Sequence, residues 1–225
     1  MATTAMNSVE ERKRLVRRLI GTGRGFAEQY GFRVTNNPGS LFQVLYLAIL
    51  LGRSGDAGRA VQTAAALRDQ GWDSPARMAR SLHEARAKVL RSCGRRDADE
   101  LASLLGDLAR TVVERYRGDL RRLRVTARYD PGAERKLLGQ LPGVDDEVIV
   151  LFLREVQALW REAAPVADRR SLAAARKLRL GRSADDLAEL AGGGESERLA
   201  WLVGALARVD VERRYDEITQ SARGR

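Results

Sequence analysis

The side chains that could do chemistry in this 225-residue chain are carboxylates and arginines, since histidine and cysteine are almost absent. His83 is the only histidine and Cys93 is the only cysteine. They cannot supply an internal disulfide, a cysteine-built zinc site or an iron–sulfur cluster, so we expect no metal and no such cofactor. A positioned carboxylate can act as a general base or stabilise a developing positive charge.

A Leu-Pro-Gly-Val turn joins two segments with helical patterns within Leu137–Trp160. This arrangement resembles a helix-hairpin-helix, in which the turn and the second helix point backbone N–H groups at a DNA phosphate. Glycine lets the backbone approach closely, and the helix N-terminus adds partial positive charge. The candidate DNA-binding residues of the turn are Leu141, Pro142, Gly143, Val144 and Asp145. Alone, such a turn occurs in any helix–turn–helix connection.

Three consecutive carboxylates, Asp145, Asp146 and Glu147, follow the glycine of this turn. They favour the first turn of the second helix through its dipole, yet they compete with a phosphate for the same helix end. We therefore expect weaker DNA binding at this hairpin than at one without them. Glu147 either points into a pocket or faces solvent, and the sequence leaves both open.

Asp168 precedes a segment with a helical pattern that runs to Leu180. By residue type and place it is an ordinary N-cap, a role worth about 1 kcal/mol. Nothing in these residues alone requires Asp168 to be catalytic.

The hairpin and Asp168, together with three further segments, resemble the helix-hairpin-helix DNA glycosylase superfamily of the endonuclease III type. The further segments are Asn-Pro-x-x-Leu-Phe at residues 37–42, the apolar Leu45–Leu51, and Leu-Arg-Glu-Val-Gln at residues 153–157. The resemblance covers Pro38 to Arg182. It places Asp168 where the superfamily has its catalytic aspartate, at the start of the next helix after the hairpin. It also implies a two-lobed helical fold and double-stranded DNA with a damaged or mispaired base as the partner.

The reaction that this resemblance implies is monofunctional base excision. The target nucleotide is flipped out of the duplex, Asp168 stabilises the positive charge that develops on the sugar, and Arg169 and Arg170 contact the DNA backbone. Two positions depart from the pattern. Asp145 replaces the second glycine of the usual Gly-x-Gly turn, and Glu147 replaces the lysine that forms a Schiff base in bifunctional members. We therefore expect neither strand cleavage nor an iron–sulfur cluster, and list Asp168 and Glu147 as the catalytic candidates.

Two other functions remain open. A relative that has lost catalysis would recognise DNA lesions or regulate repair, which the acidic hairpin favours. A helical interaction protein would carry its arginines on a solvated surface. Salt-sensitive DNA binding is expected of a glycosylase and of a lesion binder but not of an interaction protein. Base release separates the first two functions.

Charge also favours a polyanionic partner. The chain has 40 basic and 30 acidic residues, a net charge of +10. Arg115 to Lys136 holds eight basic and three acidic residues, and Arg161 to Arg182 holds seven and two. Each stretch is therefore +5, and the rest of the chain is neutral. A surplus confined to two stretches is typical of a polyanion-binding face.

Helical patterns separated by glycine, proline and capping residues run through most of the chain, and no strand alternation recurs. Ser40–Gly52 is apolar on almost all sides, which predicts a helix at the centre of a core. Asp56, Asp130 and Ser183 are expected to cap helices. Val148–Leu153 alone could form a buried strand, but its flanking segments favour a helix. We predict an all-α protein.

The chain ends carry further expectations. Ser8 and Glu11 form a plausible capping box for a helix that begins near Val9. Val211–Arg225 is polar, and we expect it either to fray or to extend the last helix. Residues 38–162 are expected to form a helical barrel domain that ends in the hairpin. Residues 1–37 with 163–225 would form the second lobe.

The cell compartment follows from what the chain lacks. No apolar run approaches the length of about 20 residues that crosses a bilayer, and the first residues become charged before any signal-like segment. We expect a monomer in the reducing cytoplasm, at the nucleoid, without a membrane partner.

Overall fold

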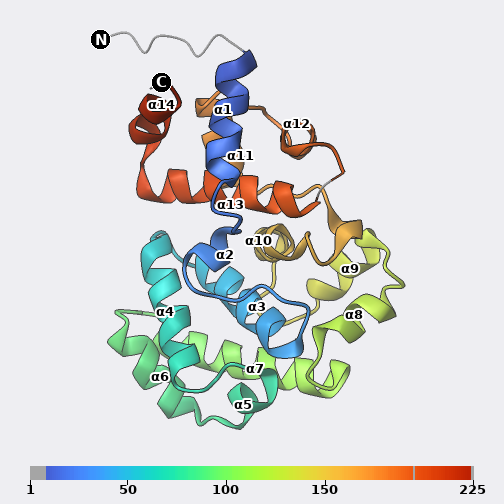
Figure 1. Ribbon diagram of the computed structural model, residues 1–225. Helices are drawn as coiled ribbons and strands as arrows, with labels where there is room; N and C mark the ends of the chain where they lie inside the picture. Colours follow the sequence, from blue (N-terminus) through green and yellow to red (C-terminus); the bar gives the residue numbers. More distant parts are fainter. Residues whose placement is uncertain (1–8, 195, 224–225) are drawn as a thin grey trace. The chain divides into compact units, whose positions relative to one another are not determined.

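The computed structural model describes residues 9–194 and 196–223, and every regular element in these ranges is helical (Figure 1). The prediction of an all-α protein is confirmed. None of the described helices is both long and apolar enough to span a membrane. The helices form two compact units: Met1–Gln29 with Leu153–Arg225, and Tyr30–Phe152.

The unit of residues 30–152 has α3, Pro38–Gly52, in its core. The Asn37 side chain caps this helix by accepting a hydrogen bond of 2.8 Å from the backbone N–H of Ser40. Every residue from Leu41 to Leu50 is buried except Gln43. An apolar helix with buried side chains all round belongs inside a core, so the prediction for Ser40–Gly52 is confirmed.

Six further helices and most of a seventh surround α3 in this unit. They are α4 (Ala57–Asp69), α5 (Pro75–Arg80), α6 (His83–Ser92), α7 (Ala98–Tyr116), α8 (Leu120–Thr126), α9 (Pro131–Leu138) and α10 (Asp146–Val156). Helix α3 packs against α4, α5 and α8, while α7 packs against α5, α6 and α8. The division between the units falls within α10, after Phe152.

The other unit is built on α13, which packs against α1, α2, α11 and α12 (Figure 1). Its elements are α1 (Val9–Ile20), α2 (Phe26–Gln29), a 3₁₀ turn (Arg161–Ala163), α11 (Arg169–Lys177), α12 (Ala184–Ala191), α13 (Ser196–Glu212) and α14 (Tyr215–Arg223). Leu15, Leu187 and Leu206 are fully buried in their shared apolar core. Gly204 of α13 has no room for a Cβ, because the backbone at Gly25 and Phe26 lies against it.

Two expectations for the chain ends meet different outcomes. Glu11 lies in the first turn of α1, but Ser8 lies outside the described residues, so the capping box stays a prediction. For residues 211–223, the described part of Val211–Arg225, the prediction of either fraying or an extended last helix is wrong. Arg213 adopts a left-handed conformation with φ of 56°, which ends α13, and α14 then packs against α1.

Candidate functional site

The predicted turn at residues 141–144 lies between α9 and α10 in the unit of residues 30–152. Gly143 has a φ of 75°, and a Cβ added there would lie 2.6 Å from Cδ2 of Leu104 in α7. The Val144 N–H donates to the Leu141 carbonyl oxygen over 3.2 Å. Both of these side chains are buried, while Pro142 is half-buried. Glycine is therefore needed here for conformation and for close packing against α7.

The carboxylates after the turn occupy the N-terminus of α10. The Asp145 side chain caps this helix by accepting a hydrogen bond of 2.9 Å from the Val148 N–H. Asp145, Asp146 and Glu147 are all exposed. The choice between the two alternatives for Glu147, a pocket or solvent, stays open. A phosphate that approached the N–H groups of this helix end would meet three negative charges.

Asp168 lies in the unit of residues 1–29 and 153–225, where it is the N-cap of α11. Its carboxylate accepts hydrogen bonds of 3.3 Å from the backbone N–H groups of Arg170 and Ser171. The residue is 4% exposed. The predicted capping role of Asp168 is therefore present, and its carboxylate lies within the fold of this unit.

A buried arginine holds the Asp168 carboxylate. Nη1 of Arg154 lies 3.1 Å from Oδ1 of Asp168, and Nη2 lies 2.6 Å from Oε1 of Glu155. The guanidinium carbon lies 4.7 Å from the ring centroid of Phe26, a cation–π distance. The other carboxylate oxygen of Glu155 accepts a hydrogen bond of 2.8 Å from the Ala27 N–H. One buried cation is thus shared by two buried carboxylates.

These contacts fix the protonation states. Burial alone would raise the pKa of the Asp168 carboxyl, but the Arg154 charge and the hydrogen bonds from Ser171 and Arg154 hold that pKa below its ordinary value. Burial alone would lower the pKa of Arg154, but Asp168 and Glu155 raise it above its ordinary value. Asp168 is therefore an ionised carboxylate at neutral pH and a poor proton acceptor.

Two neighbouring side chains, those of Ser171 and Gln157, hold the Asp168 carboxylate and the backbone before it in place. The Ser171 hydroxyl lies within hydrogen-bonding distance of the Asp168 carboxylate and of the Val203 carbonyl oxygen, and its single proton can be donated to one of them at a time. The Gln157 side-chain amide donates to the Val166 carbonyl over 2.9 Å and accepts from the Val166 N–H over 3.0 Å. This pair of bonds holds the segment that leads into Asp168.

The two arginines after Asp168 differ in their surroundings. Arg170 is half-buried, and its Nη1 lies 3.4 Å from Oδ2 of Asp210. Arg169 is exposed and forms no ion pair with any described residue. Arg169 is thus the freer of the two to bind an external anion. Both belong to the same unit as Asp168, whereas the hairpin residues belong to the other.

The sequence reasoning missed Arg154 and Glu155, which contribute most of the charge around Asp168. A signal for them was present. They are charged residues that directly follow the apolar run Val148–Leu153, and both are buried in the structure. Charged side chains in that setting are almost never buried unless they are paired, so a buried partner could have been sought.

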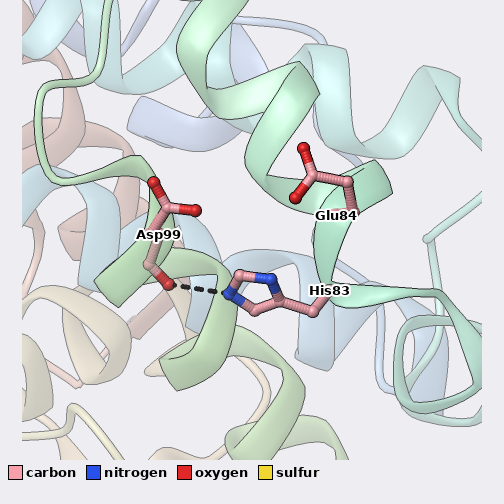
Figure 2. A group of neighbouring side chains, drawn as sticks. All are labelled: His83, Glu84 and Asp99. Carbon is pink, nitrogen blue, oxygen red and sulfur yellow. Dashed lines mark hydrogen bonds between the residues drawn. The ribbon is translucent and has the colours of Figure 1, made fainter.

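A second polar group lies on α6 and α7, where His83, Glu84 and Asp99 place possible metal-ligand atoms within 4.8 Å of one another (Figure 2). All three residues are exposed. Arg91 donates hydrogen bonds to both carboxylates. Nε2 of His83 lies 3.1 Å from the Asp99 carbonyl oxygen, which can only accept, so this nitrogen carries the proton. The arrangement is explained by ion pairing on the surface.

Comparison of the chain with protein-family models, curated proteins and solved structures finds no match.

Proposed function

We propose that this chain is a DNA-binding protein of the helix-hairpin-helix DNA glycosylase type, with the two-lobed fold of that superfamily, and that it recognises damaged or mispaired bases in duplex DNA. The observation that carries the proposal is the ionised Asp168 carboxylate at the N-terminus of α11, at the position where the sequence resemblance expects the superfamily's aspartate. The glycine turn between α9 and α10 and the net charge of +10 support it.

The chemistry around Asp168 favours lesion recognition without base excision. A catalytic aspartate must face the sugar as positive charge develops on it. The Asp168 carboxylate is 4% exposed, caps α11 and already faces the Arg154 cation at 3.1 Å. That cation opposes the approach of a second positive charge. We therefore take the non-catalytic lesion binder as the function that the geometry supports best.

A monofunctional DNA glycosylase is the second candidate, favoured by one specific observation. Asp168 is held ionised at a helix N-terminus, which is the charge state that stabilisation of a sugar cation requires. Glu147 occupies the place of the Schiff-base lysine, so this candidate hydrolyses the N-glycosidic bond and leaves the abasic strand intact.

One set of duplexes tests both candidates. Duplexes that carry alkylated, deaminated, oxidised or mismatched bases are bound under increasing salt and then treated with alkali to reveal abasic sites. Salt-sensitive binding without alkali-dependent cleavage is the expected result. Alkali-dependent cleavage that is lost in Asp168→Asn would replace the lesion binder with the glycosylase. Absence of binding to every duplex would favour a helical interaction protein and end the DNA proposal.

A further inference from the structure

A hollow of about 1050 Å³ opens on the unit of residues 1–29 and 153–225, between α1 and the connection from α11 to α12. Four arginines line it. Arg12 comes from α1, Arg176 from the last turn of α11, and Arg179 and Arg182 from the connection. All four lie within this one unit.

The arginines of this hollow are available to a ligand. Arg176, Arg179 and Arg182 are exposed, and none of their side chains forms a hydrogen bond or ion pair with a described residue. Arg12 is half-buried, and its Nη2 donates to the Leu180 carbonyl oxygen over 3.1 Å, which fixes its guanidinium at the wall. Its Nε is buried without a hydrogen-bond partner in the described part of the chain. Arg91 of α6, by contrast, is paired with Asp99.

Two acidic residues also line the hollow, Asp186 and Glu189. The Asp186 carboxylate accepts hydrogen bonds from the backbone N–H groups of Arg182 over 2.6 Å and Ser183 over 3.1 Å, and the pKa of Asp186 is lowered chiefly by the first of these bonds. This carboxylate therefore serves the capping box of α12. Among the described residues, four cations against two carboxylates leave the lining at +2.

The backbone conformation of Arg179 is the second observation. It has a φ of 56°, directly after the C-cap of α11. The Arg179 N–H donates to the Arg176 carbonyl over 3.1 Å and the Leu180 N–H donates to the Ala175 carbonyl over 2.9 Å, the two bonds of a Schellman motif. Glycine is the usual residue at this position because its φ is positive. Arginine there carries a conformational cost that glycine does not, so glycine can replace it without loss of the turn.

We infer that this hollow binds a phosphate group. Planar guanidinium groups donate paired hydrogen bonds to phosphate oxygens, and arginines without partners lose no internal ion pair when they do so. The phosphate has two possible sources, a small free phosphate compound or the backbone of a DNA strand. The second source rests on the function proposed above. In that case the hollow contacts the DNA backbone in addition to the hairpin.

The test uses Arg179→Gly in the full chain, with Arg213→Gly as its matched control. Arg213 has the same φ of 56° and the same pair of hydrogen bonds after α13, but it does not line the hollow. Both variants lose one positive charge and gain the residue that the left-handed position prefers. Both variants should therefore fold, and their unfolding temperatures should equal or exceed that of the wild type.

Pyrophosphate binding is measured by titration calorimetry, and duplex DNA binding by fluorescence anisotropy over a salt series. We expect Arg179→Gly to weaken pyrophosphate binding at least several-fold, and to reduce the slope of log K for duplex DNA against log salt by about one. Arg213→Gly should change neither. A variant that combines Arg176→Gln with Arg182→Gln should bind both pyrophosphate and duplex DNA more weakly still.

Because pyrophosphate and duplex DNA are measured separately, the phosphate site and the proposed function can fail independently. Loss of pyrophosphate binding in Arg179→Gly without any binding of duplex DNA would support a phosphate site for a free compound and would count against the proposed function. Salt-sensitive DNA binding that is the same in wild type, Arg179→Gly and the combined variant, with no measurable pyrophosphate binding, would overturn the inference and leave the proposed function standing. Equal losses in Arg179→Gly and Arg213→Gly would also overturn it.

Discussion

At the scale of single residues, Asp168 has two structural roles that explain its burial. It caps α11 and, together with Glu155, it holds the buried Arg154 cation. A capping bond contributes about 1 kcal/mol, whereas breaking a buried ion pair by removing one partner costs roughly 3–5 kcal/mol. The ion pair is therefore the larger contribution of this carboxylate to the stability of its unit.

Asp168→Asn should lower the free energy of unfolding by about 3 kcal/mol, because asparagine can still cap α11 but removes one of the two carboxylates that hold the buried Arg154 cation. Asp130→Asn is the control, since Asp130 is an exposed N-cap that accepts a hydrogen bond of 2.7 Å from the Ala133 N–H. It should change stability by only a few tenths of a kcal/mol. Urea denaturation measures both, and equal effects would show that the buried pair contributes nothing.

The same carboxylate should make stability depend on acid pH. Because the pKa of Asp168 is lower in the folded chain than in the unfolded chain, its contribution is present above the unfolded value of about 4 and is lost as pH falls through the lower folded value. The stability difference between wild type and Asp168→Asn should therefore be constant near neutrality and shrink below about pH 4. A difference that stays constant to the lowest pH at which the protein folds would contradict this assignment.

The roles of Asp168 and Arg154 differ in how well the sequence predicts them. The N-cap role of Asp168 follows from local order, because an aspartate before a helical pattern has one preferred use. The role of Arg154 depends on α10 and the start of α11 packing together, and no local pattern contains that information. Its burial beneath the Phe26 ring is likewise a tertiary contact.

At the scale of elements, the turn at residues 141–144 leads into an acidic helix end. Asp145 both caps α10 and places a negative charge at its N-terminus. Glycine is an N-cap nearly as good, at a cost of a few tenths of a kcal/mol. The DNA binding that we propose should therefore depend on the identity of this residue more than the helix does.

Asp145→Gly should strengthen binding of duplex DNA several-fold at low salt, because it removes a carboxylate from the helix end that the proposed function assigns to a DNA phosphate. Asp56→Gly is the matched control. Asp56 is an exposed cap of α4 that accepts a hydrogen bond of 3.1 Å from the Arg59 N–H, and its loss changes the net charge equally. Anisotropy titrations of both variants that gave the same affinity would exclude the hairpin from the DNA interface.

The buried helix α3 contains one polar group without a partner. The Tyr46 hydroxyl forms no hydrogen bond with a described residue, and burial raises the pKa of this tyrosine above its ordinary value. Tyr46→Phe should leave the free energy of unfolding unchanged or raise it by up to about 1 kcal/mol. Tyr215→Phe should lower it by about 1 kcal/mol or more, because the Tyr215 hydroxyl donates to Asp210 over 2.6 Å. Chemical denaturation of the two variants checks the contrast, and a loss in Tyr46→Phe equal to that in Tyr215→Phe would contradict it.

Helix starts were more predictable than short helices. The caps at Asp56 and Ser183 were predicted correctly because capping residues act locally. Residues 148–153 are helical as predicted. Helix α8 was not predicted, since its seven residues contain only two buried side chains, Leu120 and Leu123. Such a helix is stabilised by packing against α3 and α7 rather than by its own pattern.

At the scale of the whole molecule, the two basic stretches differ in how their charges are used. In the first stretch Arg121 is paired with Asp119 at 2.8 Å, and the Arg124 guanidinium lies 4.9 Å from the Tyr129 ring centroid. The second stretch supplies Arg176, Arg179 and Arg182, which have no such partners among the described residues. Composition predicted the surplus of charge but could not separate neutralised arginines from available ones, because pairing depends on the fold.

In the proposed function, this chain binds duplex DNA through its arginines and recognises altered bases. The most direct measurement is a binding titration of damaged, mismatched and undamaged duplexes at several salt concentrations. We expect log K to fall linearly with log salt for all duplexes. At least one altered duplex should bind more tightly than the undamaged one at every salt concentration. Binding that is absent, that does not depend on salt, or that is equal for all duplexes would contradict it.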